Sequence, residues 1–499
     1  MRIRSVLLAL AILLSSGTGV SSASEKPYTI MIYMNGSDLE SKIGAATIDI
    51  IEILESGLHS KNANVIIFTG GANYWQNDII PANECALWSV KNGELLEIKR
   101  LGLLNMGNPD TLADFITFSM ENFPAKKYAL IMWDHGGGAI AGFGHDEKFE
   151  YYDGSLSLPD MDYAFNKAGL RGQKLEWLGF DSCLMATVEM AAIASQYAKF
   201  LIASEDLEPA DGWDYKFLGY LNRKPKANGY QIGKEIVDTF MDFYGPDSDE
   251  ILTLSVVDLN MIRRVMTAMG QLMEQCSDKL LADVENNFTV LAKHRRNTKT
   301  FGEGSPRDNE SDMVDIGDMA TQLADIFPYE VYRVHSELND AVLYNRHNSK
   351  TPLHGLSAYY VYGGRFYESL DLYSQLDVNE AYVQYLLKFF DELTANDMDD
   401  TRPALQRELW GQPVTLYRTA QLTDRTRYAV PAKINGKDCD IIVCIKDEAQ
   451  ELNVLGYRYT DYPVKQKGYY TFGPDDEIIV DTSYTGVSTA APEWDTAAE

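Results

Sequence analysis

Short apolar runs alternate with amphipathic stretches from about residue 28 to residue 390, and most of the runs end in polar or glycine-rich residues. The expected strands cover residues 28–35, 64–70, 127–133, 175–180, 200–204, 252–257 and 355–361, with a hairpin over 85–101. Helical periodicity covers residues 43–54, 110–122, 184–194, 231–243 and 319–326. Strands separated by helices predict an α/β fold with a mostly parallel sheet covered on both faces. In such sheets, ligands bind at the carboxyl ends of the strands.

The first of these helices shows both a start signal and an apolar stripe. Residues 37–40 (Ser-Asp-Leu-Glu) have the spacing of a capping box. The stripe that follows is formed by Ile43, Ile48, Ile51 and Leu54. The pattern predicts one helix that presents these side chains to the core.

The periodicity changes to two after residues 396–403, a polar stretch that we interpret as a linker. Alternating strands are expected over 413–417, 427–434, 438–445 and 451–459, and Asn435-Gly436 is a hairpin signal. We therefore predict an α/β domain over residues 24–395, followed by a linker and a small antiparallel β domain over 396–499. Residues 295–311 are polar and glycine-rich, which predicts a long surface loop beside a site.

The N-terminus has the features of a signal peptide over residues 1–23. Arg2 and Arg4 precede an apolar run over 6–14, and Ser21-Ser22-Ala23 supplies small residues for cleavage after Ala23. The run is too short to span a bilayer, although a retained anchor is the alternative. We expect a soluble protein without stable membrane insertion that is secreted or periplasmic.

The composition is that of a globular protein, with 45% hydrophobic and 23% charged residues and a net charge of -29. This charge argues against nucleic acid as a partner, because a polyanion would be repelled. It would attract cationic polypeptides, or it serves solubility alone.

Five cysteines are scattered along the chain: Cys85, Cys183, Cys276, Cys439 and Cys444. So few in so long a chain form no disulfide framework, and an odd number leaves at least one unpaired or linked to another chain. Cys439 and Cys444 lack the spacing and the nearby histidine of a zinc site. One free thiol therefore needs a reason.

Cys183 follows the expected strand 175–180 and begins the helix-compatible stretch 184–194. A thiol in the first turn of a helix has a lowered pKa, because it lies at the positive end of the helix dipole. Asp181 or Ser182 could cap this helix. The alternative is a buried, inert cysteine.

His135 lies 48 positions before Cys183, directly after the expected strand 127–133 and before three glycines. The glycines let the backbone approach a ligand closely. A general base near neutral pH and a thiol that needs activation form a nucleophilic pair. For His135 alone, a hydrogen-bonded turn histidine is the alternative.

The two motifs, Trp-Asp-His-Gly-Gly-Gly at 133–138 and Gly-Phe-Asp-Ser-Cys-Leu-Met at 179–185, resemble those of the clostripain family of cysteine peptidases, which have a caspase-like fold. Residues 31–40, 204–215 and 355–360 support the resemblance, which covers about 28–390 and excludes the C-terminal β domain. Ala210 departs from the pattern, because a glycine is expected there.

The resemblance implies a Cys183 nucleophile and a His135 general base that hydrolyse peptide bonds through an acyl-enzyme. It also implies that the N–H groups of Gly136 and Cys183 form the oxyanion hole. Members cleave after Arg or Lys, so the partners are protein or peptide substrates with basic residues. Asp181 and Asp211 are the expected substrate-binding acids, with Asp206 as the fallback. The alternatives are a helix cap for Asp181 and an exposed turn carboxylate for Asp211.

Members can also cut themselves between the His and Cys strands, where Lys148 is the candidate cleavage site; the alternative is an ordinary exposed lysine. We expect no required cofactor and no metal ligands. Calcium is left open, because some members depend on it although no EF-hand spacing occurs here.

Three other functions compete with this interpretation. Residues 136–141 (Gly-Gly-Gly-Ala-Ile-Ala) satisfy a dinucleotide-binding pattern, but the residues that follow do not open a helix. A non-catalytic secreted binding protein on the same fold is the second. A serine hydrolase at Ser182 is the third, without a Gly-x-Ser-x-Gly motif.

Overall fold

The computed structural model describes residues 25–149, 153–246, 248–302, 311–362, 373, 376 and 379–395, together with the strands of a C-terminal sheet between residues 406 and 480. The predicted signal peptide and the predicted linker at 396–403 lie outside the described residues, so the domain boundaries stay predictions.

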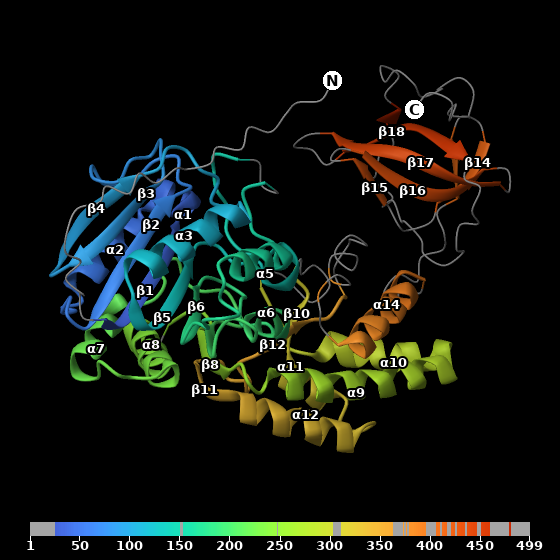
Figure 1. Ribbon diagram of the computed structural model, residues 1–499. Helices are drawn as coiled ribbons and strands as arrows, with labels where there is room; N and C mark the ends of the chain where they lie inside the picture. The colour runs from blue at the N-terminus through green and yellow to red at the C-terminus, as the bar shows by residue number, and fades with distance from the viewer. Residues whose placement is uncertain are drawn as a thin grey trace.

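A nine-stranded sheet forms the centre of the molecule, in the order β11-β8-β7-β6-β5-β1-β2-β3-β4 (Figure 1). Its strands are β1 (Lys26–Asn35), β2 (Ala63–Gly70), β3 (Ala86–Lys91), β4 (Glu94–Arg100), β5 (Ala125–Trp133), β6 (Trp177–Asp181), β7 (Phe200–Ala203), β8 (Thr253–Asp258) and β11 (Val342–His347). The five central strands, from β2 to β7 in the sheet order, pair in parallel, and antiparallel strands extend both edges. The predicted α/β fold is confirmed.

Helices cover both faces of this sheet (Figure 1). One face packs against α3 (Pro109–Asn122), α5 (Leu158–Lys167), α6 (Val188–Ala194) and α9 (Ile262–Ala282), and the other against α2 (Ala45–Glu55), η1 (Tyr215–Gly219) and α8 (Gly229–Tyr244). Side chains alternate along a strand, so Met31 and Tyr33 of β1 enter the first core while Ile30 and Ile32 enter the second. The central strands are therefore apolar on both faces, as parallel strands require.

A second helical layer extends from α9. It contains α10 (Val284–Asn297), α11 (Ile316–Gln322), α12 (Pro328–Ala341) and α14 (Glu380–Ala395). Beside it, β9 (Thr300–Phe301), β10 (Met313–Asp315) and β12 (Ser357–Tyr359) form a small antiparallel sheet. The strand expected at 355–361 is therefore part of this separate sheet.

Arg295 shows that the loop predicted at 295–311 does not begin at the surface. It lies in the last turn of α10 with a side chain that is 0% exposed, and its Nη2 is 3.2 Å from the equally buried Asp312 Oδ1. Its Nε donates to the Tyr360 carbonyl at 2.7 Å. The prediction was wrong for this end because a charge pattern cannot reveal a buried ion pair; residues 303–310 lie outside the described part.

The C-terminal sheet contains β13 (Gln406–Leu409), β14 (Gln412–Leu416), β15 (Gln421–Asp424), β16 (Arg427–Ile434), β17 (Lys437–Lys446), β18 (Glu451–Tyr459) and β19 (Ile479–Val480). The pairing is antiparallel except between β18 and β19. Ile434 pairs with Lys437, as the hairpin signal predicted, although the two turn residues themselves are outside the described part.

The capping box predicted at residues 37–40 is absent. The chain forms two helices, α1 (Ser37–Ile43) and α2, separated by Gly44 at φ 77°. Glu40 instead accepts from the backbone N–H of Thr47 at 2.8 Å and of Gln76 at 2.6 Å. The predicted apolar stripe is also wrong, because the break at Gly44 rotates α2 so that Ile50 and Ile53 enter the core.

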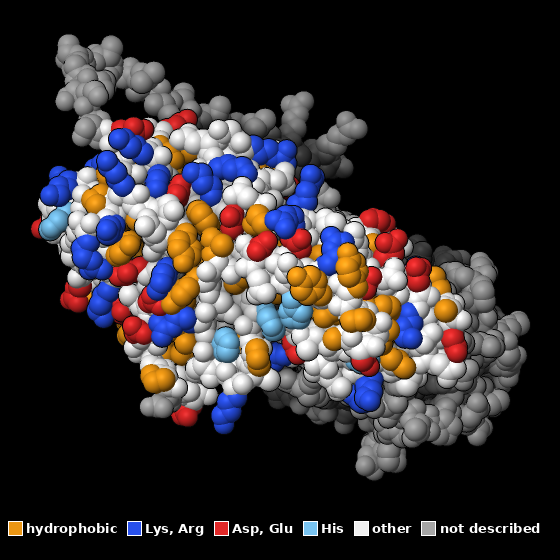
Figure 2. Space-filling view, turned by 90° about the horizontal axis from the view of Figure 1, so that it is seen from below, with side chains coloured by type: hydrophobic (Ala, Val, Ile, Leu, Met, Phe, Trp, Pro, Cys, Tyr) orange, Lys and Arg blue, Asp and Glu red, His pale blue; other side chains and the backbone are white. Residues whose placement is uncertain are grey.

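Charge is mixed on the face shown in Figure 2, where basic and acidic side chains are interspersed among scattered apolar ones. The excess of acidic residues in the sequence therefore does not form one continuous acidic field on this face. Among the described residues, no helix is long and apolar enough to cross a membrane.

Replacing Ile53 by Ala should lower the free energy of unfolding by about 2 to 4 kcal/mol, because Ile53 is 1% exposed and its loss leaves a cavity. The matched variant Ile51→Ala should change it by less than about 0.5 kcal/mol, because Ile51 is 48% exposed. Denaturant unfolding followed by circular dichroism measures both, and equal losses would contradict this orientation of α2.

Candidate active site

His135 and Cys183 each lie two residues beyond the end of a strand, and these strands are neighbours in the sheet. β5 and β6 pair in parallel, with Trp133 directly opposite Asp181. Their carboxyl ends therefore meet at one edge, where ligands bind in sheets of this kind. The two motifs therefore share this edge of the sheet.

Gly136 is the point of closest approach between the two loops. A Cβ added to it would lie 1.9 Å from the Cys183 carbonyl oxygen, far inside van der Waals contact. Among the described residues, no group accepts a hydrogen bond from the N–H of Gly136, and only the thiol of Cys183 accepts from its own N–H. Both expected oxyanion donors therefore lack another hydrogen-bond acceptor in the part of the chain that the structure describes.

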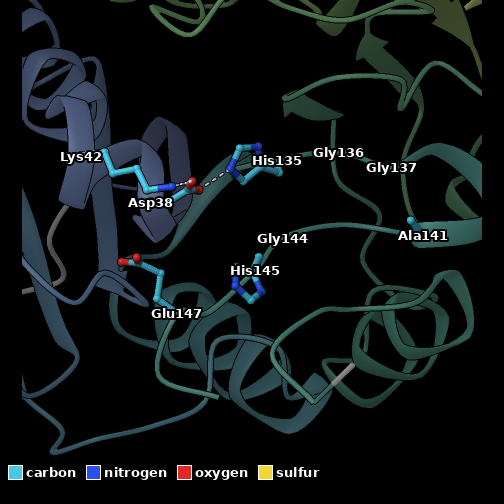
Figure 3. Close-up of a pocket in the computed structure, with 10 residues that line it drawn as sticks. Asp38, Lys42, His135, Gly136, Gly137, Ala141, Gly144, His145 and Glu147 are labelled. Carbon is cyan, nitrogen blue, oxygen red and sulfur yellow. Dashed lines mark hydrogen bonds and ion pairs between the residues drawn. The ribbon is translucent and has the colours of Figure 1, made fainter. Parts of the chain in front are cut away.

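The imidazole of His135 is held by Asp38 of α1, with 2.6 Å between Nε2 and Oδ1 (Figure 3). Lys42 Nζ contacts the other oxygen, Asp38 Oδ2, at 2.9 Å. Burial would raise the pKa of Asp38, but its hydrogen bonds to His135 and Lys42 outweigh this and lower the pKa to about 2. Asp38 is thus an anion that fixes the ring and leaves Nδ1 for another partner.

Asp134 fixes the loop that carries His135. Its carboxylate accepts from Asn35 Nδ2 at 2.5 Å and from the backbone N–H groups of His135 and His145, both at 2.6 Å. Burial raises the pKa of Asp134 to about 7. Through these hydrogen bonds, Asp134 connects the His135 loop to Asn35 at the end of β1.

A pocket of about 470 Å³ opens beside His135 (Figure 3). Its lining comes from α1 and from the loops after β5: Asp38, Lys42, His135, Gly136, Gly137, Ala141, Gly142, Gly144, His145 and Glu147. The lining carries both signs of charge, so this cavity alone does not favour a basic side chain.

Cys183 lies in a loop and not in the first turn of a helix. Leu184 adopts φ 62°, and α6 begins only at Val188, where Thr187 Oγ1 accepts from the Met190 N–H at 2.9 Å. The helix-start prediction was wrong because residues 184–186 bond in extended fashion to 204–206. The helix dipole consequently does not activate the thiol, and neither Asp181 nor Ser182 is a cap.

The thiol is held by Glu208. Cys183 Sγ accepts from the Glu208 N–H at 3.2 Å and lies 3.8 Å from the Glu208 carbonyl oxygen. Burial raises the pKa of the Cys183 thiol to about 11. Within the described residues no hydrogen bond joins Cys183 to His135, so each member of the predicted pair has a different partner here.

Asp181 is buried behind Cys183. Its carboxylate accepts from the Trp213 N–H at 3.1 Å and from the Tyr215 hydroxyl at 2.8 Å, and burial raises its pKa to about 7. The charge of Asp181 raises the pKa of two further buried carboxyl groups, those of Asp49 and Glu208.

The other two expected acids lie differently. Asp211 is exposed at the rim of this group. Asp206 accepts from the Gly302 N–H at 2.9 Å and pairs with Lys299 Nζ at 3.6 Å, so its charge is already compensated. The fallback residue therefore anchors the segment that follows α10.

Lys148 is not an ordinary exposed lysine. Its ammonium group donates to the Ala72 carbonyl oxygen and its N–H to Asp146 Oδ1 at 3.0 Å. Burial lowers the pKa of this ammonium group. As a cleavage site, the side chain would have to leave these contacts first.

Sequence reasoning missed three site residues. Asp38 was interpreted only as part of a capping box, and Asp49 was hidden because it interrupts the apolar face of α2. Trp133 Nε1 donates to Asp49 Oδ2 at 2.6 Å, a contact that links α2 to β5. Glu208 lies in the quoted segment 204–215, which was its one available signal.

The competing chemistries find little support. After Gly137, the helix α4 (Gly138–Ala141) has only four residues and ends at Gly142, so no long helix N-terminus is available to a pyrophosphate. Ser182 Oγ is buried and makes no hydrogen bond within the described residues. In the same part of the chain, no group of three or more His, Cys, Asp or Glu side chains could hold a metal ion; calcium dependence stays untested.

Fold and site together define an α/β protein with a thiol and an imidazole at adjacent strand ends. A sequence model described as the clostripain family matches residues 32–391. The chain belongs to the clostripain family, a family of cysteine peptidases.

Individual relatives agree with this assignment. Clostripain from Hathewaya histolytica is 33% identical over 131 residues, an alignment that spans 22% of this chain and 23% of that protein. A secreted C11 cysteine protease from Bacteroides thetaiotaomicron in complex with an irreversible peptide inhibitor has a TM-score of 0.54 at 14% identity, over 71% of this chain and 98% of its own. An inactive zymogen C11 protease from Parabacteroides distasonis has a TM-score of 0.54 at 19% identity, and the match covers 73% of this chain and 99% of that protein's chain. These two structures show the shared fold.

Replacing Gly136 by Ala should lower the rates of peptide hydrolysis and of Cys183 alkylation by about 100-fold, because the new Cβ would push the two loops apart. Gly172→Ala is the matched control, since its nearest neighbour is 3.6 Å away. Unchanged rates in the Gly136 variant would show that the close approach is not needed.

Replacing Asp181 by Asn should stabilise the protein at pH 8 more than at pH 5. The folded-state pKa is about 7, above the unfolded value of 3.8, so the folded carboxyl holds its proton longer and its stabilising contribution is lost as pH rises from about 4 to 7. Melting temperatures of wild type, this variant and the exposed-site control Asp78→Asn test this. A difference that does not change with pH would contradict it.

Proposed function

We propose that this chain is an exported cysteine endopeptidase that cleaves after Arg or Lys through Cys183 and His135. The observation that carries the proposal is the close approach of Gly136 to Cys183, which brings the two motif loops together at the ends of adjacent strands. Peptide or protein substrates follow from the family. Export and the basic preference are part of the proposal.

In this mechanism, Asp38 keeps its contact with Nε2 of His135 while Nδ1 takes the proton from the Cys183 thiol. The thiolate attacks the substrate carbonyl carbon, and the oxygen gains negative charge that the N–H groups of Gly136 and Cys183 stabilise. The imidazolium then gives its proton to the leaving amine as the C–N bond breaks, leaving a thioester. Water, deprotonated by His135, hydrolyses this acyl-enzyme and restores the thiol.

The substrate-free arrangement requires a rearrangement before this chemistry. The thiol is protonated, because its pKa is about 11, and it contacts Glu208 and not His135. Cleavage after Lys148, which lies between the two catalytic strands, is the proposed activating step. Release of its ammonium group from Ala72 would free the strand-end loops to move.

The basic preference is supported by the acidic group behind Cys183. Asp181 lies two residues before the nucleophile at the same strand end, and Asp211 lies at the rim. A substrate guanidinium or ammonium group would find carboxylates there that lack a basic partner among the described side chains. Domain boundaries and the role of the C-terminal sheet remain predictions.

Mature protein should hydrolyse short fluorogenic peptides with Arg or Lys before the cut at least about 100-fold faster than peptides with Asp, Asn or Ala there, because only a cation compensates the buried acids. Cys183→Ala should abolish both turnover and any cut after Lys148. Asp181→Asn should retain turnover but reduce the preference for basic residues.

The control is Cys276→Ala, which removes another buried thiol of the chain. Turnover that survives in Cys183→Ala and disappears in Cys276→Ala would show that Cys276, and not Cys183, is the nucleophile. Equal rates on all five peptides would remove the basic preference while leaving the peptidase assignment intact.

A further inference from the structure

Glu208 contacts both halves of the candidate site. Its backbone N–H donates to the Cys183 thiol at 3.2 Å, while its side chain extends into the acidic group that contains Asp181. One residue thus lies between the reacting sulfur and the place where a substrate's basic side chain would bind.

The carboxylate of Glu208 has no basic partner among the described residues, and the Trp213 indole is its neighbouring donor. Both of its oxygens are buried and make no hydrogen bond within the described residues, and one oxygen of Asp49 is in the same condition. Trp213 lies close enough to lower the pKa of Glu208, although its Nε1–H makes no hydrogen bond of normal geometry. A buried acid with so few hydrogen bonds is costly, which points to a ligand that supplies further donors.

Apart from the Trp213 indole, the described groups near this carboxylate are acidic or phenolic. Burial and then Asp181 raise the pKa of Glu208 well above its usual range. Asp49, Asp211 and Tyr244 belong to the same neighbourhood, since Asp181, Glu208, Asp211 and Asp49 all raise the pKa of Tyr244. Among the described residues, no Lys, Arg or His forms an ion pair with Asp49, Asp181 or Glu208. We therefore look to the basic side chain of a substrate for the donors that the described residues do not supply.

We propose that Glu208 is a specificity-determining residue: its carboxylate, together with those of Asp181 and Asp49, binds the guanidinium or ammonium group of the substrate's basic side chain, and this cation offsets the negative charge beside the Cys183 thiol. The proposal rests on the proposed function above. It adds a second consequence of cation binding. The bound cation increases substrate affinity, and it also promotes formation of the Cys183 thiolate.

The coupling between pocket and thiol follows from simple electrostatics. Burial raises the pKa of the Cys183 thiol most; the hydrogen bond from the Glu208 N–H lowers it, and the charges of Glu208 and Asp206 raise it. In a dry region, the thiol and the Glu208 carboxyl therefore compete for ionisation because like charges repel. A cation beside Glu208 would remove this competition, so a basic side chain bound there would also favour formation of the thiolate.

The first test compares peptides with Arg or with its neutral isostere citrulline before the cut. Glu208→Gln keeps the backbone N–H and the side-chain shape but removes the charge, so the arginine-over-citrulline ratio of kcat/KM should fall about 10- to 100-fold. Glu121→Gln, which removes an exposed carboxylate of α3, is the matched control and should keep the wild-type ratio.

The outcomes separate the two levels of the proposal. A wild type that does not prefer arginine over citrulline overturns the proposed basic preference and the role of Glu208 with it. A strong wild-type preference that persists in Glu208→Gln overturns only the role of Glu208. The melting temperature should not fall in Glu208→Gln, since the amide keeps the shape of a carboxyl group that is protonated without substrate, and a fall matching the loss of activity would assign Glu208 a structural role.

The second test measures alkylation of Cys183 by iodoacetamide, a neutral reagent, with and without methylguanidinium. The cation should accelerate alkylation several-fold in wild type, and the acceleration should be smaller in Glu208→Gln. Without the cation, the rate of Cys183 alkylation should be at least as high in Glu208→Gln as in wild type, because the variant lacks the competing charge. Equal acceleration in both proteins would overturn the coupling between Glu208 and the thiol.

Discussion

The parallel pairing of β5 with β6 is the constraint on which the candidate site depends. It sets Trp133 opposite Asp181, so the loops that leave these strands must run side by side. They can do so only because Gly136 has no side chain where the Cys183 carbonyl lies. The hydrogen bonds of Asp134 and the Asp38 contact then fix the His135 loop and its ring from the β1 side.

A second feature of the structure is a group of buried acids that reaches Cys183, the candidate nucleophile, through Glu208. Asp49, Asp181 and Glu208 are held without a basic partner among the described residues, and burial raises the pKa of each. Protonation makes this tolerable in the absence of substrate. In the proposed function, the same arrangement would favour a cationic substrate over a neutral one, while burial keeps the Cys183 thiol protonated in the absence of substrate.

Local sequence signals failed where tertiary contacts overrode them. The Ser-Asp-Leu-Glu box was plausible, but Glu40 bonds to Thr47 and Gln76 and Asp38 to His135. Residues 184–186 have helical composition, yet their N–H groups bond to carbonyl groups in 204–206, and as a result Cys183 lies beside Glu208. Arg295 was predicted to lie in a surface loop, but it is buried and forms an ion pair with the equally buried Asp312. In each case, the deciding partner is distant in sequence.

The sequence by itself determined the α/β fold, the strand ends that carry His135 and Cys183, and the position of Asp181, because apolar periodicity and short motifs are local properties of the chain. Only the tertiary structure decided that Asp38 holds the imidazole, that Glu208 holds the thiol, and that Asp49 joins Asp181 in a buried acidic group. These contacts depend on which helix and which loop the sheet brings together, and that choice arises from packing over the whole molecule.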